Sequence, residues 1–311
     1  LVGSEMSIRD SMAETLSRAL AAQGMRVLCG ESLARRTTLR VGGPARWLVE
    51  PACEAQVAQA LQVARNEGVE VLILGNGSNL LVRDGGFDGL VIAIGPAMSS
   101  FAREGDGYVV QAGCPLVRLA QQAQADGLSG LESLSGIPGT VGGAAWMNAG
   151  AYGGEMKDVV EEVECADAEG KLEVLSVSEL QLSYRHSALE GTGKLVTSAT
   201  LRLSPGEPEE IRARMRELME KRRASQPLDL PSAGSTFKRP QGGFAAALID
   251  QAGLKGFAIG GAQVSEKHAG FVVNRGGATF EDVTQLMRHI QKTVFDRSGI
   301  MLEPEVRILK G

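Results

Sequence analysis

The residues with the clearest chemical potential lie in a glycine-rich run at positions 135–154, where seven of twenty residues are glycine. Glycine has no Cβ and tolerates positive φ, so such a run brings backbone N–H groups close to a ligand. A flexible linker is the alternative, but linkers are usually Gly/Ser or charged and lack residues such as Ile137, Trp146 and Tyr152. The run therefore predicts a segment that lines a ligand site.

A second small-residue segment, Gly-Asn-Gly-Ser-Asn at positions 75–79, directly follows an apolar run at 69–74. It begins like a dinucleotide-binding fingerprint, but Leu80 stands where the third glycine belongs and the chain continues as a strand. A Walker loop is excluded because no Gly-Lys-Ser/Thr occurs. The segment is compatible with a nest of N–H groups for a diphosphate or with a hairpin turn. Its pattern alone leaves both open.

The composition predicts a cytoplasmic globular enzyme. The chain has 311 residues, 43% of them hydrophobic, which suggests about two domains with ample core. A net charge of −5 gives no electrostatic case for nucleic acid as a partner, and no apolar run approaches a membrane span. We expect no signal peptide before the first helix. The cysteines are far apart without a CxxC pair, which argues against structural zinc and disulfides; they are Cys29, Cys53, Cys114 and Cys165.

The elements that must position these loops follow from hydrophobic spacing. Met12, Leu16 and Leu20 share one face of a first helix. The expected helices span residues 7–23, 53–67, 115–126, 206–223, 244–252 and 280–297. The expected strands span residues 47–50, 69–74, 80–82, 89–94, 108–112, 159–167, 171–177, 194–203 and 271–274. The run at 69–74 is expected to be a buried strand because it is almost entirely apolar. The Pro- and Gly-rich break at 204–208 is the expected domain boundary.

Six short motifs, taken in order, resemble the UDP-N-acetylenolpyruvoylglucosamine reductase family. They are Thr-Leu-Arg-Val-Gly-Gly at 38–43, the segment 75–79, Gly-Ile-Pro-Gly-Thr-Val-Gly-Gly at 136–143, Ser-Tyr-Arg at 183–185, Gly-Ser-Thr-Phe-Lys at 234–238 and Glu-Pro-Glu-Val-Arg at 303–307. Each motif alone is weak, but together they span almost the whole chain.

The resemblance implies an α+β protein with a vanillyl-alcohol-oxidase-type FAD-binding fold. It implies an N-terminal helical segment at 1–30, a FAD-binding region of two subdomains at 31–205 and a smaller α+β substrate-binding domain at 206–311. The segment from 185 to 203 is short, which resembles the compact second type of the family. Arg239 stands where the other branch has asparagine.

The resemblance also implies FAD as cofactor, NADPH as co-substrate and a nucleotide-sugar substrate, handled by a monomer. NADPH would reduce the flavin, and the reduced flavin would then reduce the enolpyruvyl group of the substrate. The residues implied for cofactor binding are Gly75, Asn76, Gly77, Ser78, Asn79, Gly113, Cys114, Ser135, Gly136, Ile137, Pro138, Gly139, Thr140, Gly142 and Gly143.

The resemblance implies that three residues take part in the chemical step. Arg185 would offer a planar cation to a carboxylate, although a surface ion pair is its simpler role. Ser235 would give a proton to a developing carbanion, and otherwise it is a turn residue beside glycine. Glu305 is favoured over Glu303 by the family pattern, and it would need a raised pKa to be useful beside an enolate. The residues expected to bind substrate are Tyr184, Lys238, Arg239, Lys267 and His268.

Two other functions remain open at this stage. A flavin oxidase or dehydrogenase of the same fold could act on a hydroxy acid, but it would not need the paired 234–238 and 303–307 motifs. A non-catalytic nucleotide-binding module would need only the glycine-rich loops.

Overall fold

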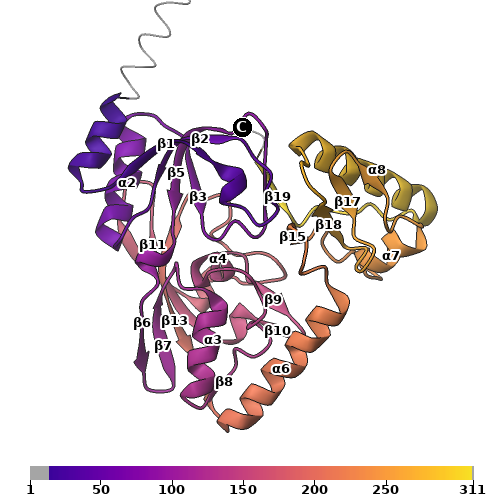
Figure 1. Ribbon diagram of the computed structural model, residues 1–311. Helices are drawn as coiled ribbons and strands as arrows, with labels where there is room; N and C mark the ends of the chain where they lie inside the picture. Colours follow the sequence, from indigo (N-terminus) through magenta and orange to yellow (C-terminus); the bar gives the residue numbers. More distant parts are fainter. Residues whose placement is uncertain (1–13, 310–311) are drawn as a thin grey trace, which may run out of the picture. The chain divides into compact units, whose positions relative to one another are not determined.

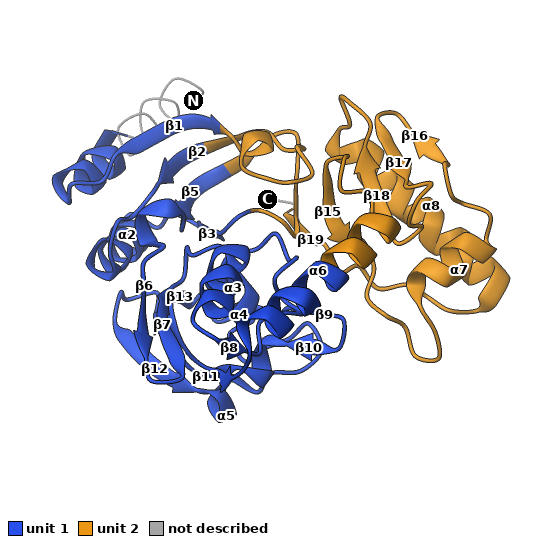
Figure 2. Ribbon diagram, turned by 60° about the horizontal axis from the view of Figure 1, so that its bottom comes forward, with its two compact units in different colours: residues 1–31, 46–76, 88–218 blue, residues 32–45, 77–87, 219–311 orange. Residues whose placement is uncertain are grey.

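The computed structural model describes residues 14–309, and the chain forms two compact units. Unit 1 takes residues 1–31, 46–76 and 88–218; unit 2 takes 32–45, 77–87 and 219–311 (Figure 2). The expected C-terminal domain at 206–311 falls mainly in unit 2, but unit 2 also takes in two N-terminal segments that the sequence does not predict. Strand pairing explains one of them, since β4 (Leu80–Val82) lies parallel to β19 (Arg307–Leu309).

The first sheet of unit 1 has four strands in the order β1-β2-β5-β3 (Figure 1). Their bounds are β1 (Val27–Ser32), β2 (Pro44–Val49), β3 (Val71–Leu74) and β5 (Phe87–Ala93), and α2 (Glu54–Asn66) connects β2 to β3. Strand β3 pairs in parallel with β5 only, so it lies at a sheet edge. The expected buried strand at 69–74 is therefore wrong in one respect: Ile73 is 37% exposed and Leu74 alone of the strand is buried. The apolar pattern correctly indicated a strand, but it could not indicate that the strand lies at the edge of the sheet and is partly exposed.

The first helix is described over residues 14–22, within the expected span of 7–23. Leu16 and Leu20 are fully buried in the core of unit 1, as their spacing predicts. Met12 lies outside the described residues.

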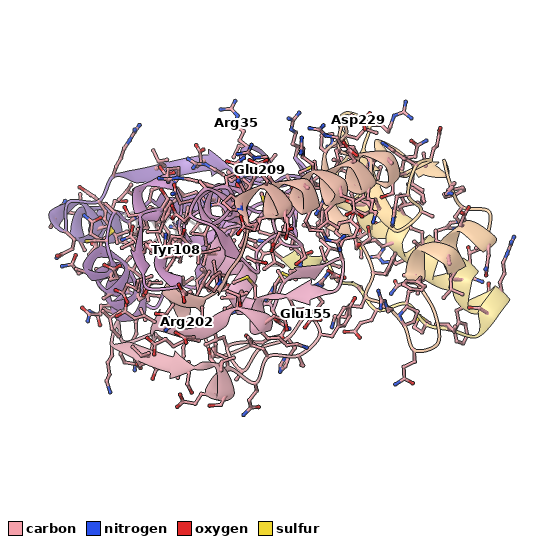
Figure 3. All side chains as sticks on the ribbon, turned by 90° about the horizontal axis from the view of Figure 1, so that it is seen from below. Arg35, Tyr108, Glu155, Arg202, Glu209 and Asp229 are labelled. Atoms are coloured by element: carbon pink, nitrogen blue, oxygen red, sulfur yellow. The ribbon has the colours of Figure 1, made fainter. Side chains whose placement is uncertain are left out.

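The second sheet of unit 1 is antiparallel, with the order β12-β11-β13-β7-β6. Its strands are β6 (Phe101–Glu104), β7 (Gly107–Gln111), β11 (Val160–Ala166), β12 (Leu172–Ser176) and β13 (Leu195–Arg202). The antiparallel sheet expected from alternation over 159–203 is confirmed. The helices of this region are α3 (Leu116–Ala125), α4 (Val141–Trp146) and α5 (Val177–Leu180). Tyr108, labelled in Figure 3, is 1% exposed in the core that this sheet shares with α3.

Unit 2 contains a second, smaller antiparallel sheet with the order β15-β18-β17-β16. Its strands are β15 (Ser232–Ser235), β16 (Ala258–Ile259), β17 (Ala262–Val264) and β18 (Phe271–Asn274). Helix α6 (Pro208–Ser225) leads from unit 1 into unit 2, where α7 (Ala245–Gln251) and α8 (Phe280–Ser298) follow. Helix α8 is capped by Thr279 in a capping box with Asp282 and ends at Gly299. Its apolar face packs in the core of unit 2 through Leu286, Met287 and Ile290.

Short elements complete the fold. They are the 3-10 turns η1 (Leu33–Arg35), η2 (Pro96–Met98) and η3 (Met156–Asp158) and the strands β8 (Leu128–Ser129), β9 (Gly150–Ala151), β10 (Gly154–Glu155) and β14 (Ser204–Pro205). The fold is thus α+β, as expected, with mainly antiparallel sheets and helices packed against them.

Candidate active site

Two of the expected phosphate-binding segments lie against each other within unit 1. The Asn76 side chain donates from Nδ2 to the carbonyl of Pro138 at 2.6 Å. A Cβ added at Gly75 would lie 2.8 Å from Oγ1 of Thr140. The start of the 75–79 segment and the glycine-rich loop are therefore in contact, although 62 positions separate Asn76 from Pro138.

The glycine-rich loop leaves backbone donors free for a ligand. The fold uses some of them: Gly142 N–H donates to Ala112 O at 2.9 Å, and Gly143 N–H points at the Thr140 hydroxyl at 3.4 Å. Within residues 14–309, the N–H groups of Gly136, Gly139 and Thr140 donate to no protein acceptor. Uncommitted N–H groups beside a second glycine segment fit the diphosphate of a dinucleotide cofactor, with no Rossmann helix required.

The expected cofactor-binding residues divide into two groups by what surrounds them. A Cβ at Gly142 would lie 2.5 Å from the Ala112 Cβ, and one at Gly113 would lie 2.2 Å from Gly95 O, so these glycines serve packing. Cys114 is fully buried, and burial raises the pKa of its thiol, so it remains an inert core residue. By contrast Gly143 is exposed, and only Thr140 Oγ1 lies within 4 Å of its would-be Cβ.

Within unit 2, Gly77 allows the 75–79 segment to pack closely against the chain around the 38–43 motif. Its φ of +60° is a left-handed value, and a Cβ there would meet Arg36 O at 2.2 Å. Its carbonyl accepts from Thr38 N–H at 3.1 Å. The 75–79 turn is therefore built on the 38–43 segment and continues directly into β4.

Ser235 and Glu305 lie on paired segments of unit 2. Ser235 ends β15, after Gly234 at a φ of +77°. Glu305 N–H donates to Thr236 O at 2.9 Å, and Phe237 bridges to Pro304. The two expected catalytic residues of unit 2 are thus brought together by backbone pairing.

Asn79 joins the same cluster. Its Nδ2 donates to Glu305 O at 3.1 Å, and its carbonyl accepts from Arg307 N–H at 3.1 Å. The backbone on both sides of the Glu305 side chain is therefore held, and residues 77–79 meet the 234–238 and 303–307 motifs in unit 2.

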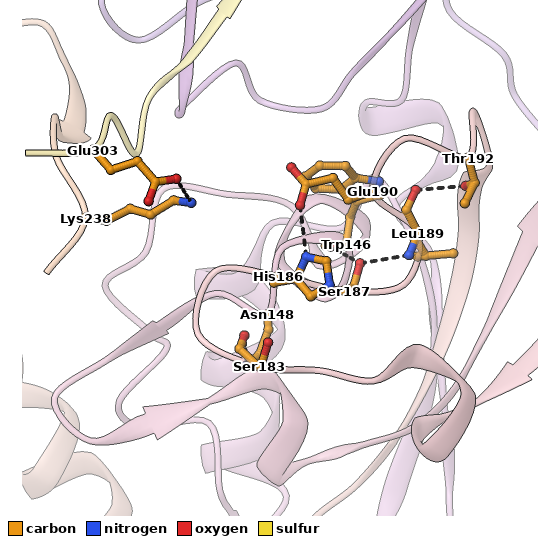
Figure 4. Close-up of polar contacts among 10 residues, drawn as sticks. All are labelled: Trp146, Asn148, Ser183, His186, Ser187, Leu189, Glu190, Thr192, Lys238 and Glu303. Carbon is orange, nitrogen blue, oxygen red and sulfur yellow. Dashed lines mark hydrogen bonds and ion pairs between the residues drawn. The ribbon is translucent and has the colours of Figure 1, made fainter. Parts of the chain in front are cut away.

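The expected substrate-binding residues of unit 2 have contacts of their own. Lys238 Nζ lies 2.5 Å from Glu303 Oε1, a half-exposed ion pair that Figure 4 shows. Lys267 donates from Nζ to Arg223 O near the C-terminus of α6. Arg239 stacks 4.5 Å above the ring of Phe244, which is 59% exposed.

His268 is half-buried and held by its neighbours. Gly270 N–H donates to its Nδ1 at 3.2 Å, and its ring packs edge-on against Phe271. Burial lowers the pKa of His268, and the nearby Lys255 lowers it further. The lowered pKa favours the neutral imidazole, which is a weaker partner for an anion than a charged one.

Arg185 lies in unit 1, at the tip of a tight hairpin. Ser183 and His186 exchange two backbone hydrogen bonds of 3.1 Å, which leaves Tyr184 and Arg185 as the turn residues. Arg185 has a φ of +54°, unusual for a residue other than glycine. Its guanidinium donates to Gly150 O at 3.1 Å and lies 5.2 Å from the centre of the Tyr184 ring.

The sequence analysis assigned no role to Asn148 or Glu155. The structure shows that they hydrogen-bond to each other and that Glu155 interacts electrostatically with Arg185. Asn148 is fully buried, and its Nδ2 donates to Glu155 Oε2 at 2.9 Å. The Lys157 hydrogen bond holds the pKa of Glu155 below its usual value, and Asn148 and Arg185 add to this effect. The signal available in the sequence was a single amide side chain within an otherwise apolar, glycine-rich run.

Among residues 14–309, no group of three or more His, Cys, Asp or Glu side chains could hold a metal ion. All four cysteines are free thiols. No helix in the described part of the chain is long and apolar enough to cross a membrane.

Comparison with known proteins identifies the family. Residues 45–176 match the profile of a FAD binding domain, and residues 226–309 match the C-terminal domain of UDP-N-acetylenolpyruvoylglucosamine reductase. The first match confirms the expected FAD-binding fold. The reductase of Latilactobacillus sakei is 46% identical over 93% of this chain and 95% of its own length. That of Caldanaerobacter subterraneus is 46% identical over 90% of this chain and 92% of its own. The crystal structure of the Thermus caldophilus reductase superposes with a TM-score of 0.79 at 39% identity, covering 91% of this chain and 98% of that one. The chain belongs to the UDP-N-acetylenolpyruvoylglucosamine reductase family.

Proposed function

We propose that the chain reduces the enolpyruvyl group of UDP-N-acetylenolpyruvoylglucosamine to give UDP-N-acetylmuramate for peptidoglycan synthesis, with Ser235, Glu305 and Arg185 acting on the substrate. It is a FAD-dependent oxidoreductase that uses NADPH. Bound FAD supplies two-electron transfer between NADPH and the substrate. The observation that carries the proposal is the backbone pairing of residues 236–238, which follow Ser235, with residues 303–305, since a general flavin oxidase has no need of it.

The glycine loops of unit 1 would hold the FAD diphosphate. The N–H groups of Gly136, Gly139 and Thr140 have no protein acceptor among the described residues, and Gly75 and Asn76 lie against this loop. An N–H donor aimed at a charged oxygen is roughly twice as strong as one aimed at a neutral acceptor. The loop thus binds an anion without any cationic side chain.

Reduction of the vinyl group requires one hydride and one proton. The terminal vinyl carbon would receive the hydride from bound FAD, and the electron pair of the double bond would then move to the neighbouring carbon and into the adjoining carboxylate. The Ser235 hydroxyl donates its proton to that carbon, and the resulting alkoxide recovers a proton from solvent or a neighbour. A hydroxyl is a weak acid, but a carbanion is basic enough to take its proton.

Arg185 and Glu305 would stabilise the charge that develops. Arg185 offers its guanidinium to the substrate carboxylate, where a permanent planar cation forms two parallel hydrogen bonds. Glu305 acts as a neutral or proton-sharing acid beside the enolate, because a full negative charge there would oppose the reaction. Its backbone is fixed on both sides by Thr236 and Asn79.

The nucleotide part of the substrate would contact Tyr184, Lys238, Arg239, Lys267 and His268. Of these, Lys238 and Arg239 have exposed or half-exposed cationic groups three and four residues after Ser235. The engaged Lys267 and the neutral His268 are weaker candidates for the diphosphate. We expect the chain to act as a cytoplasmic monomer on this small molecule, with no nucleic acid or membrane partner.

Anaerobic absorbance spectroscopy tests the function. NADPH should bleach the flavin band of the purified protein, and the enolpyruvyl substrate should restore it in equal amount. Extraction should release FAD and not FMN. Flavin that is restored by no enolpyruvyl substrate but reduced by a hydroxy acid would point to an oxidase. A protein that is colourless and takes up no FAD would be a nucleotide-binding module instead.

A further inference from the structure

Asn148 ties together three segments of unit 1. It lies two residues after the end of α4, is fully buried and has a φ of +46°. Its Nδ2 donates to Ser183 O and to Glu155 Oε2, both at 2.9 Å. Its Oδ1 accepts from Lys157 N–H at 2.9 Å. The amide therefore donates two hydrogen bonds and accepts one. No aliphatic or carboxylate side chain can make the same three contacts.

These contacts lead to Arg185. The Ser183 carbonyl held by Asn148 belongs to one of the two residues that close the Tyr184–Arg185 turn, and Figure 4 shows Asn148 directly beside Ser183. The Arg185 guanidinium donates to Gly150 O, two residues beyond Asn148 in the chain. The Glu155 carboxylate held by Asn148 also interacts electrostatically with Arg185. Asn148 thus fixes both the turn and the groups that face the guanidinium.

Backbone strain is concentrated in the same place. Five residues other than glycine have positive φ among those described, and three of them are Asn148, Tyr152 and Arg185. Such conformations persist only where the surroundings hold them, and they gather at sites where position matters. Asparagine tolerates this conformation better than most residues, which suits it to position 148.

We infer that Asn148 is a positioning residue for the reduction, acting through Arg185. This rests on the role proposed above for Arg185. With Asn148 in place, the guanidinium is held where it meets the substrate carboxylate. Without the amide, the turn and the Glu155 carboxylate lose their common anchor, and the guanidinium moves away from its productive position.

A double-mutant cycle tests this inference. Asn148→Gly keeps the left-handed backbone but removes the amide, and it is made alone and together with Arg185→Ala. The readouts are the rate of flavin reoxidation by substrate, the affinity for the reaction product by calorimetry and the melting temperature. Alone, Asn148→Gly should slow reoxidation about 10- to 100-fold, the effect expected of a misplaced catalytic group, and weaken product binding. In the Arg185→Ala background it should add less than about threefold, because the group through which it acts is gone.

Thr197→Val is the matched control. Thr197 is also fully buried in unit 1, and its hydroxyl also hydrogen-bonds a glutamate, Glu164, at 2.8 Å. This variant should lower the melting temperature without slowing reoxidation or changing the double-mutant result. If Asn148→Gly does not fold, Asn148→Asp replaces it, since aspartate keeps the acceptor for Lys157 N–H but repels Ser183 O and Glu155.

The outcomes distinguish a failure of the positioning role of Asn148 from a failure of the role proposed for Arg185. A loss from Asn148→Gly that adds in full to that of Arg185→Ala would overturn the positioning role and leave the proposed function standing. Unchanged reoxidation in Arg185→Ala itself would overturn the role of Arg185, and the inference with it.

Discussion

The glycine-rich loop of unit 1 and the Ser235 segment of unit 2 (residues 234–238 and the paired 303–305) present different kinds of functional group to a ligand. Residues 135–143 contain no charged side chain, and their useful groups are backbone N–H donors. The Ser235 segment instead gathers Ser235, Lys238, Glu303 and Glu305, whose useful groups are side chains. The loop's N–H groups can therefore be blocked by added bulk, but no substitution other than proline removes them. The groups of the Ser235 segment can be removed one atom at a time.

The difference predicts how each region responds to mutation. A change in the loop should act on cofactor binding or folding, and a change at the Ser235 segment should act on the rate of one step. Of the four expectations below, given in order of decreasing effect, the first three test that division and the fourth concerns a histidine outside both regions.

Ser235→Ala should produce the largest effect. It should slow flavin reoxidation by the enolpyruvyl substrate by about 10²–10⁴-fold, the usual loss for a positioned proton donor, and leave reduction by NADPH nearly intact. Ser235→Cys keeps a donor and should recover part of the rate, and Glu305→Gln should also slow only reoxidation. Stopped-flow absorbance at the flavin band resolves the two steps. Equal slowing of both steps by Ser235→Ala would place the residue in flavin binding or folding.

Substituting valine for Gly142 and for Gly143, which are adjacent in the loop, should affect stability in one case and FAD affinity in the other. At Gly142 the Cβ would lie 2.5 Å from Ala112 Cβ, so Gly142→Val should cost about 1–3 kcal/mol of stability through overpacking. At exposed Gly143 there is room within the protein, so Gly143→Val should keep the melting temperature of the FAD-free protein. The added side chain should weaken FAD binding about tenfold, because its bulk would keep the diphosphate from one neighbouring N–H donor of the loop. Thermal unfolding and equilibrium FAD titration measure the two quantities. Full FAD affinity in Gly143→Val would show that the cofactor does not approach this glycine.

Glu303→Gln should have a smaller effect, confined to substrate binding. It frees Lys238 from a half-exposed ion pair, and such a pair contributes about 0–1 kcal/mol. The KM for the substrate should therefore fall by up to about fivefold with little change in kcat. Glu305→Gln is the contrasting variant, since it should change the rate instead. A higher KM in Glu303→Gln would mean that Glu303 orients Lys238 for the substrate and does not compete with it.

His268 should give the smallest effect, visible in the pH dependence of stability. Burial lowers its pKa, so the folded protein favours neutral imidazole. The unfolded chain takes up this proton first as the pH falls below about 6.5, so stability present above that value is lost toward lower pH. Denaturant unfolding between about pH 7 and 5 should show this decline, and His268→Gln should reduce it. An unchanged slope in the variant would assign the decline to other groups.

Local pattern predicted most helices and strands closely. The helix expected at 280–297 is Phe280–Ser298, and that expected at 115–126 is Leu116–Ala125. Both have apolar spacing along one face and end signals within the segment itself, so nearby residues suffice to define them. The run at 69–74 marks the limit: apolar residues indicated a strand, but its edge position depends on which strands pair with it.

By itself, the sequence determined the two glycine segments, the six motifs and the family resemblance, since these are properties of consecutive residues. Only the tertiary structure decided that Lys238 pairs with Glu303, 65 positions away, and that Glu305 N–H bonds to Thr236 O. It alone decided that Gly142 packs on Ala112 while Gly143 stays open, although the two glycines are neighbours in the chain. It alone placed a buried amide, Asn148, behind Arg185. The physical reason is the same each time: a periodic pattern reports which face of a segment is buried, but hydrogen-bond partners and steric neighbours are set by segments that meet only after the chain has folded.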